Sequence, residues 1–272
     1  AMCLIILAID VHPAYPLVVA ANRDEYYHRP TAPLAFWDDM PDVLAGRDLV
    51  GGGTWLGVSK TGRIAAVTNY RAPGHQKPDA RSRGLLVTRF LTGDMAAEAY
   101  MQHVRKEKDA YNRFNLVAGD RKRIWWMSNV SHKIQQLTSG LSGISNRLLN
   151  TPWPKIVSAK SRLHDILAFG SDFDVEAIFT LLSDTSTPED HHLPDTGIGM
   201  EWERILSPIF VISDIYGTRS SSVIRCDHAG NLTFWERTWQ VPGPVPAPAE
   251  TRRMELDIPA FDVGVSGETA RK

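Results

Sequence analysis

The sequence predicts an α+β protein built as a four-layer α/β/β/α sandwich of antiparallel sheets. The class follows from two observations: apolar runs of strand length occur in pairs joined by turns, and segments with helical apolar spacing interrupt them. The layers follow from a third, because Leu4–Ile9 and Leu17–Ala21 are apolar at consecutive positions. Such strands are covered on both faces, which two packed sheets with helices outside provide.

The apolar pairs are expected to form hairpins, because turn residues separate their members. His12-Pro13, Lys60-Thr61-Gly62, Asp120-Arg121-Lys122 and the segment 227–231 supply these turns. The expected strands are 4–9, 17–21, 55–59, 63–68, 114–118, 124–127, 209–212, 222–225 and 232–236.

Three segments carry the apolar spacing of a helix. After Gly84, apolar residues recur from Met95 to Val104, and Asp94 is placed to cap that part. Between Lys155 and Phe169 an apolar stripe follows Pro154, a favoured residue at the start of a helix. A shorter helix is expected over 175–182.

The length suits one large domain or two small ones, and we expect a single domain over residues 2–240. The segment from Val241 to Glu250 is rich in proline, which cannot enter a central strand. Residues 241–272 are therefore expected to form an extended surface tail.

Charge and cysteine content exclude several protein classes. The chain has 30 basic and 31 acidic residues, so its net charge attracts neither nucleic acid nor anionic lipid. Two cysteines, Cys3 and Cys226, make no disulfide framework, which favours a reducing, cytoplasmic setting. The run Leu4–Ile9 is too short to span a membrane and lacks a signal peptide's flanks.

The start of the chain suggests a catalytic group. Ala1 is interpreted as a cloning remnant, so the natural chain is expected to begin Met2-Cys3. Removal of Met2 would place a free α-amine beside the Cys3 thiol. An α-amine titrates near pH ~8, so it can accept the thiol proton and activate the sulfur for acyl transfer. The alternative is that Cys3 is a small buried core residue.

Polar clusters at strand ends supply further candidates. Asn22-Arg23-Asp24-Glu25 follows an apolar strand, where Asp24 could hold the ammonium form of the Cys3 amine or belong to a salt-bridged turn. Asn69 and Asn146 are amide donors of the kind that stabilise an oxyanion, and Arg219 lies in Tyr216-Gly217-Thr218-Arg219. Each is equally compatible with a turn. Gly51-Gly52-Gly53 lacks the ending of a phosphate loop and is expected to be a flexible turn.

The sequence argues against a resident metal. His191 and His192 are adjacent in a polar loop, and no pair of ligands has zinc spacing. The motif for covalent haem attachment is absent, although a histidine could ligate loosely held haem. No metal or cofactor is therefore expected, apart from haem under one alternative below.

An ordered series of motifs resembles the NRDE-motif family, also called the Transport and Golgi Organization 2 family. The resemblance rests on Met2-Cys3 before an apolar strand, Ala20-Ala21-Asn22-Arg23-Asp24-Glu25, Gly53-Thr54-Trp55-Leu56-Gly57-Val58, Val67-Thr68-Asn69-Tyr70, Tyr111–Leu116, Ser145-Asn146 with Thr151-Pro152-Trp153, and Tyr216–Arg219. It covers residues 2–237 and implies an N-terminal nucleophile (Ntn) hydrolase-like fold. Haem handling and acyl-lipid metabolism are the activities associated with the family.

A weaker resemblance connects the chain to the cholylglycine hydrolase and penicillin V acylase branch of Ntn hydrolases. It implies that Cys3 is the nucleophile, Asp24 the carboxylate that binds its amine, Asn69 and Asn146 the two asparagines, and Arg219 the late arginine. The sequence departs from that pattern at Ala21, where the branch has arginine, while Arg23 is adjacent to Asp24 instead.

Two functions are therefore expected as alternatives. The first is an Ntn-type cysteine hydrolase that cleaves an amide or thioester of a small acylated molecule, with Asn22, Arg23, Glu25, Trp55 and Tyr70 binding substrate. The second is a non-catalytic carrier of haem or an acyl lipid on the same fold. Retention of Met2-Cys3 favours the enzyme, and Ala21 favours the carrier.

Overall fold

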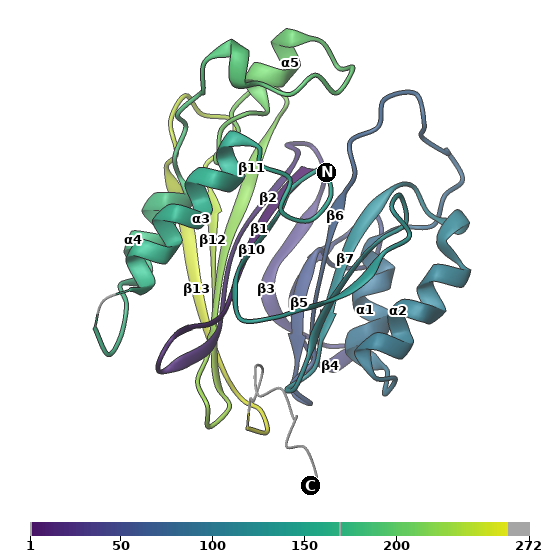
Figure 1. The fold of residues 1–272 in the computed structure, drawn as a ribbon, viewed down its shortest axis with the longest axis vertical. Helices are drawn as coiled ribbons and strands as arrows, with labels where there is room; N and C mark the ends of the chain where they lie inside the picture. The colour runs from purple at the N-terminus through teal and green to yellow at the C-terminus, as the bar shows by residue number, and fades with distance from the viewer. Residues whose placement is uncertain (1, 169, 261–272) are drawn as a thin grey trace, which may run out of the picture.

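Two antiparallel sheets form the centre of the molecule (Figure 1). The structure, a computed structural model, describes residues 2–168 and 170–260. The first sheet has the order β10-β1-β2-β11-β12-β13 and the second β3-β4-β5-β6-β7-β8-β9. The strands of the first sheet are β1 (Met2–His12), β2 (Tyr15–Tyr26), β10 (Gly140–Ile144), β11 (Tyr216–Cys226), β12 (Asn231–Trp239) and β13 (Pro248–Asp257). Those of the second are β3 (Thr31–Trp37), β4 (Met40–Asp48), β5 (Leu56–Ser59), β6 (Ile64–Asn69), β7 (Phe114–Gly119), β8 (Ile124–Ser128) and β9 (Ile134–Leu137).

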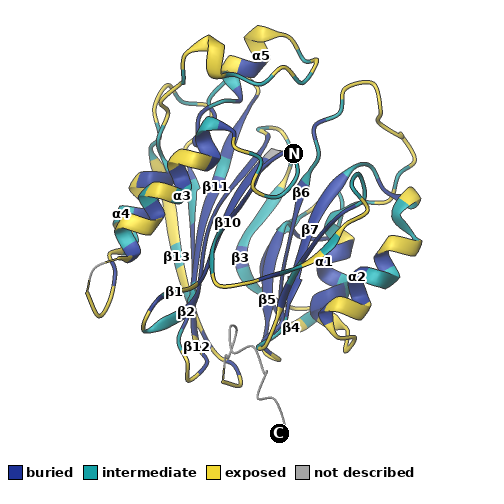
Figure 2. Cartoon of the chain, viewed as in Figure 1, coloured by how far each residue is buried: buried dark blue, intermediate teal, exposed yellow. Residues whose placement is uncertain are grey.

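Helices cover the outer face of each sheet, which confirms the predicted four-layer α+β sandwich (Figure 1). The first sheet is covered by α3 (Pro154–Leu167) and α4 (Val175–Leu182), and the second by α1 (Gly84–Thr92) and α2 (Ala97–Lys106). A short helix, α5 (Met200–Ile205), lies beyond one end of the first sheet. The helices turn exposed residues outward and buried residues toward the sheets (Figure 2).

Strand β1 shows why both faces had to be covered. Ile5, Leu7 and Ile9 point into the cluster between the two sheets. Leu4, Ile6 and Ala8, on the other face, pack against α3 and α4. Burial of each Leu or Ile side chain contributes about 2 kcal/mol to folding, so a strand apolar on both faces stabilises two layers at once.

Two local predictions are wrong. Residues 209–211 are buried and Ile212 is half-buried, but they form no strand, apart from an isolated bridge between Ile212 and Gly217. Their backbone bonds go elsewhere: the Ile209 carbonyl accepts from Asn22, and the Val211 N–H donates to the Thr218 hydroxyl. Asp94 does not cap α2; the N-cap is Ala96, which makes no side-chain capping bond.

Part of the expected tail belongs to the sheet. Strand β13 (Pro248–Asp257) pairs with β12 at the sheet's edge. Most of the prolines of this segment precede residue 249, and the proline-free stretch from Ala249 to Ile258 can donate its N–H groups to a neighbouring strand. Residues 261–272 lie outside the described residues.

In the part of the chain that the structure describes, none of the helices combines the length and apolarity needed to cross a bilayer.

Candidate active site

The pairing of β1 with β2 separates the polar motif onto two faces of the sheet. Cys3 lies opposite Arg23, and Met2 opposite Asp24. Because side chains alternate along a strand, Arg23 and Glu25 share the face between the sheets with Cys3, while Asn22 and Asp24 point toward the helices. Ala21 is also on the Cys3 face. An arginine therefore borders the cysteine despite the alanine at position 21.

A cavity of about 980 Å³ opens between the two sheets and α5 at this end of the molecule. It brings together seven of the predicted site residues: Cys3, Arg23, Glu25, Trp55, Asn69, Tyr70 and Asn146. Three others, Asn22, Asp24 and Arg219, are not among its lining residues.

Cys3 is at the inner wall of this cavity with only 4% of its surface exposed. Burial, reinforced by the negative charge of Asp24, raises the pKa of the Cys3 thiol to about 11, and Arg23 acts in the opposite direction. The thiol is therefore protonated at neutral pH. A neighbouring base is needed before the sulfur can act as a nucleophile.

Asp24 is buried behind Cys3, on the helix face of β2. Its Oδ1 accepts a hydrogen bond from Thr218 Oγ1 at 2.7 Å, and its carbonyl accepts one from Tyr216 Oη at 2.9 Å. Burial raises the pKa of Asp24 to about 6, opposed first by the positive charge of Lys155. Among the described residues, Asp24 Oδ2 has no hydrogen-bond partner. This oxygen is available to a cation near the start of β1.

Asn22 has a structural role in this arrangement. Its Nδ2 donates to the carbonyls of Leu182 and Ile209 at 2.8 and 2.9 Å, and its Oδ1 accepts from Ser221 Oγ at 2.6 Å. These bonds tie β2 to β11, to the end of α4 and to the segment before β11.

Arg23 and Trp55 form part of the cavity wall. The Arg23 guanidinium lies 4.3 Å from the centre of the Trp55 ring, and its Nη2 is 3.8 Å from Glu25 Oε2. Glu25 also accepts from the Tyr26 N–H at 2.9 Å and lies 3.7 Å from Arg29. Arg23 Nη1 has no hydrogen-bond partner within the described chain, so it can receive a polar group in the cavity.

The two predicted asparagines lie close together, although Asn69 ends β6 of the second sheet and Asn146 follows β10 of the first. Asn146 Nδ2 donates to the Asn69 carbonyl at 2.9 Å, and Asn146 Oδ1 accepts from Ser145 Oγ. Asn146 is fully buried, whereas Asn69 is half-buried at the end of β6. Thr68 Oγ1 binds the Ser145 carbonyl at 2.7 Å and strengthens this junction.

Tyr70, the next residue, lies beneath the Arg147 guanidinium, which is 5.1 Å from its ring centre. Its N–H donates to the Arg113 carbonyl at 3.1 Å. Tyr70 is therefore held at the cavity wall by contacts with two arginine-bearing segments.

Arg219 binds the loop that follows β2. Its Nη1 donates to the carbonyls of Tyr26, Tyr27 and Arg29 at 2.9 to 3.1 Å. The pairing of β11 with β2 shifts register between Thr218 and Ser220, so Arg219 is the extra residue of a bulge. As a result Thr218, and not Arg219, is the β11 residue opposite Asp24, and it donates to the Asp24 carboxylate.

The structure adds residues that the sequence did not identify. The cavity wall includes five further arginines, Arg29, Arg71, Arg81, Arg83 and Arg113. Burial lowers the pKa of Arg83, and the charges of Cys3 and Glu25 oppose this shift without reversing it. Lys155 is buried near Asp24. Its position four residues before Ala159 and eight before Leu163 places it on the buried stripe of α3, which is a signal present in the sequence.

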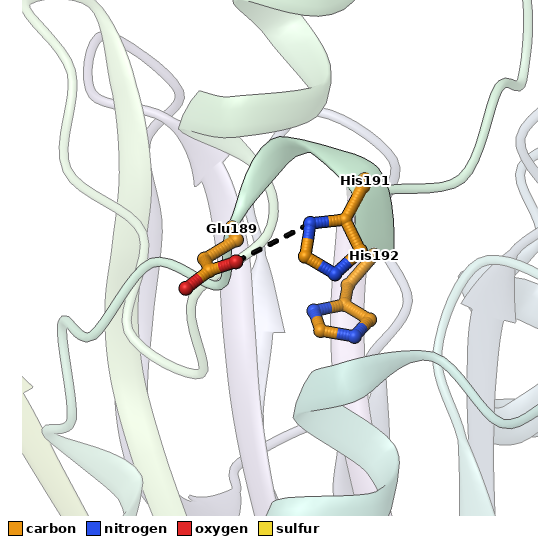
Figure 3. Close-up of side chains that lie close together, drawn as sticks. All are labelled: Glu189, His191 and His192. Carbon is orange, nitrogen blue, oxygen red and sulfur yellow. Dashed lines mark ion pairs between the residues drawn. The ribbon is translucent and has the colours of Figure 1, made fainter.

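Glu189, His191 and His192 form a separate group outside the cavity lining (Figure 3). Their potential ligand atoms all lie within 4.8 Å of one another, and His191 Nδ1 is 3.3 Å from Glu189 Oε2. All three side chains are exposed. Metal binding here would have to order three solvated side chains.

Comparison with known proteins places the chain in a family. A family model described as Transport and Golgi organisation 2 matches residues 2–241. The Transport and Golgi organization 2 homolog of Mus musculus is 36% identical over 257 residues, which cover 87% of this chain and 93% of that protein. The Bos taurus homolog is 37% identical with the same coverage, and the Drosophila melanogaster protein is 28% identical over 262 residues, 87% of this chain and 92% of that protein.

Two solved structures of low sequence identity are similar in part. A mutant of the conjugated bile acid hydrolase from Clostridium perfringens gives a TM-score of 0.46 at 9% identity over 99% of this chain and 100% of that one. A Caenorhabditis elegans N-acylethanolamine-hydrolyzing acid amidase ortholog gives 0.43 at 11% identity over 82% of this chain and 92% of that one.

Proposed function

The chain belongs to the Transport and Golgi organisation 2 family, and we propose that it is a hydrolase in which Cys3, as the first residue of the processed chain, cleaves an amide or thioester of a small acylated molecule. One observation carries the proposal. Of the two cysteines, Cys3 lines a polar cavity beside Arg23, Asn69 and Asn146, whereas Cys226 lies in the apolar core between the sheets.

The first half of the reaction is acylation of Cys3. The free α-amine accepts the thiol proton, and the thiolate attacks the carbonyl carbon of the substrate. Amide donors in the cavity, Asn69 foremost, stabilise the negative oxygen of the tetrahedral intermediate. The intermediate collapses to a thioester on Cys3, and the leaving amine or thiolate takes the proton from the α-ammonium.

The second half returns the enzyme to its starting state. The α-amine accepts a proton from water as the water oxygen attacks the thioester carbonyl. Collapse of this second intermediate releases the acid and restores the Cys3 thiol. Asp24 orients the amine in both halves, since its unpartnered oxygen lies on the strand next to the start of β1.

Trapping of the acyl-enzyme tests the proposal. Protein that begins at Cys3 is compared with protein that retains Ala1 and Met2, using acyl thioesters and activated amides of increasing chain length. We expect intact-mass and peptide spectra to show one acyl group on Cys3 of the processed protein. Cys3→Ser would lose the thioester, and Cys226→Ala would keep it.

Two outcomes would overturn the hydrolase proposal. One is acylation divided equally between Cys3 and Cys226, because this would indicate general thiol chemistry. The other is the same rate of product release from the processed protein and from the form that retains Ala1 and Met2, since the mechanism depends on a free Cys3 amine.

A carrier function is the second candidate, and one observation favours it. His75 is exposed on the cavity wall among the arginines, where an imidazole and cationic side chains could receive haem iron and its carboxylates. Optical titration with haem tests this candidate. We expect a shifted absorbance band at one equivalent that His75→Ala removes; an unchanged spectrum would eliminate it.

A further inference from the structure

Lys155 is a buried lysine next to the candidate active site. It is the second residue of α3, only 5% exposed, on the same stripe as Ala159 and Leu163. Its Nζ donates to the Leu206 carbonyl at 2.8 Å. A buried ammonium is costly unless a negative charge compensates it, so the groups around Lys155 decide what it does.

Four charged or ionisable groups face Lys155 from the neighbouring elements: Asp24 of β2, Cys3 of β1, Arg71 after β6 and Glu203 of α5. Arg71 and Glu203 form a buried ion pair with a 2.6 Å contact. Because these two charges offset each other, Asp24 is the carboxylate left to compensate Lys155. Burial lowers the pKa of Lys155 to about 8, and the attraction of Asp24 is the largest opposing cause.

Besides Lys155, a second cation can approach Asp24. Thr218 occupies its Oδ1, and its Oδ2 has no hydrogen-bond partner in the described part of the chain. In the β1–β2 register, Cys3 pairs with Arg23, the residue that precedes Asp24. The backbone nitrogen of Cys3 lies in the plane of the sheet, between the face of its own thiol and the face of Asp24.

A carboxylate alone would be harmful to an amine that must act as a base. An unperturbed α-amine has a pKa of ~8, and a neighbouring negative charge raises that pKa, so the amine would remain protonated at neutral pH. A second positive charge on the same carboxylate acts in the opposite direction.

We propose that Lys155 is a positioning residue which shares Asp24 with the α-amine of Cys3 and thereby keeps that amine neutral, in the proton-accepting form, near pH 7. This inference rests on the proposed function and deepens it. Asp24 orients the amine, and Lys155 prevents the carboxylate from holding the proton. Thr218 fixes one oxygen of the Asp24 carboxylate through its hydrogen bond.

Titration of the amine itself tests the inference without reference to turnover. Protein that begins at Cys3 is labelled with 15N at cysteine, which gives two signals because the chain has two cysteines. The Cys226 nitrogen is a backbone amide and serves as an internal reference. The chemical shift of the Cys3 nitrogen against pH reports its protonation.

Lys155→Met removes the charge and keeps the side chain's length. We expect the midpoint of the Cys3 amine titration to rise by about one pH unit. The midpoint of the acid limb of the kcat/KM profile should move to higher pH by the same amount. At pH 7 the rate would fall about fivefold, and above pH ~9 it would approach that of the unaltered protein. A merely structural role would lower the rate equally at every pH.

Three further variants complete the test. Lys155→Gln retains a donor for the Leu206 carbonyl and should give the same shift if Lys155→Met fails to fold. Lys155→Arg keeps the charge and should restore the original midpoint. Lys160→Met alters a half-buried lysine of the same helix, bound to Asn150, and should leave the amine midpoint unchanged.

The outcomes separate the inference from the proposed function. An unmoved amine midpoint in folded Lys155→Met and Lys155→Gln would overturn the role of Lys155. A shifted midpoint in a processed protein that forms no acyl-enzyme would support that role and overturn the hydrolase.

Discussion

Cys3 and Cys226 lie in the same sheet, beside opposite ends of β2, and their surroundings differ completely. Strand β2 pairs with both neighbours, placing Arg23 across from Cys3 and Leu17 across from Cys226. Both thiols are free and buried, with 4% and 0% exposure. Burial raises the pKa of Cys3 to about 11 and that of Cys226 to about 12.

The comparison shows that burial and thiol pKa do not by themselves distinguish a reactive cysteine. What differs is the neighbourhood. Cys226 belongs to the apolar cluster between the sheets and contacts the Asp227 carbonyl at 3.4 Å. Cys3 borders a cavity, with charged groups on both faces of its strand.

The largest expected difference is in alkylation. In protein that begins at Cys3, iodoacetamide at pH 7.5 should modify Cys3 about a thousandfold faster than Cys226, because Cys226 becomes accessible only when the core opens. Peptide mass spectrometry over a time course measures both rates in one sample. Similar rates for the two would remove the distinction between the regions.

The cavity end should also dominate the pH dependence of stability. Burial raises the pKa of Asp24 to about 6 and that of Glu236 to about 7, so folded protein holds these protons above the ordinary carboxyl range. The unfolding free energy should therefore fall as pH rises from about 4 to 7, by about 3 kcal/mol for each group.

Denaturant unfolding at a series of pH values measures this slope. Glu236 is buried and accepts from the Leu34 N–H at 2.7 Å. Glu236→Gln should flatten the slope near pH 7 and Asp24→Asn near pH 6. A stability that rises over this range in the unaltered protein would contradict the assignment.

Truncation of each thiol is expected to have a smaller effect. Cys226→Ala should lower the unfolding free energy by about 1–2 kcal/mol, because it leaves a void in packed core. Cys3→Ala should cost about 0.5 kcal/mol or less, since the lost sulfur borders a cavity that is already open. Thermal and urea unfolding of both variants gives the comparison; equal losses would show that Cys3 is packed as tightly as Cys226.

The smallest effect is expected at an exposed ion pair. Arg204 and Asp190 form an exposed ion pair with contacts of 2.8 and 2.5 Å. Asp190→Asn should change stability by about 0.5 kcal/mol or less, because water screens exposed pairs. Urea unfolding of this variant calibrates the two cysteine variants, and a larger loss would point to a structural role for the segment before α5.

The sequence predicted most of the β1–β2 region correctly, and its predictions failed for several other segments. Consecutive apolar residues on β1 and β2 required cover on both faces, and the structure supplies it. Strands β3 and β4 were missed, because Pro33 and the Asp38-Asp39 turn interrupt a run of mixed polarity. The apolar segment 209–212 was mistaken for a strand, since side chains satisfy its backbone groups.

The residues of the candidate site were likewise predicted only in part. The motifs identified Cys3, Asn69 and Asn146, and the cavity brings them together. Lys155 was overlooked, although its helical position marks it as buried, because the identity of its partner depends on how α3 packs on the sheet.

By itself, the sequence determined the class of fold and the residue types at the start of β1 and the end of β2, because apolar periodicity is set by the faces of each single element. Only the tertiary structure decided which charges meet. The bulge at Arg219 shifts β11 by one residue and delivers Thr218 to Asp24. A one-residue shift reverses every side chain beyond it, and no local pattern encodes that register.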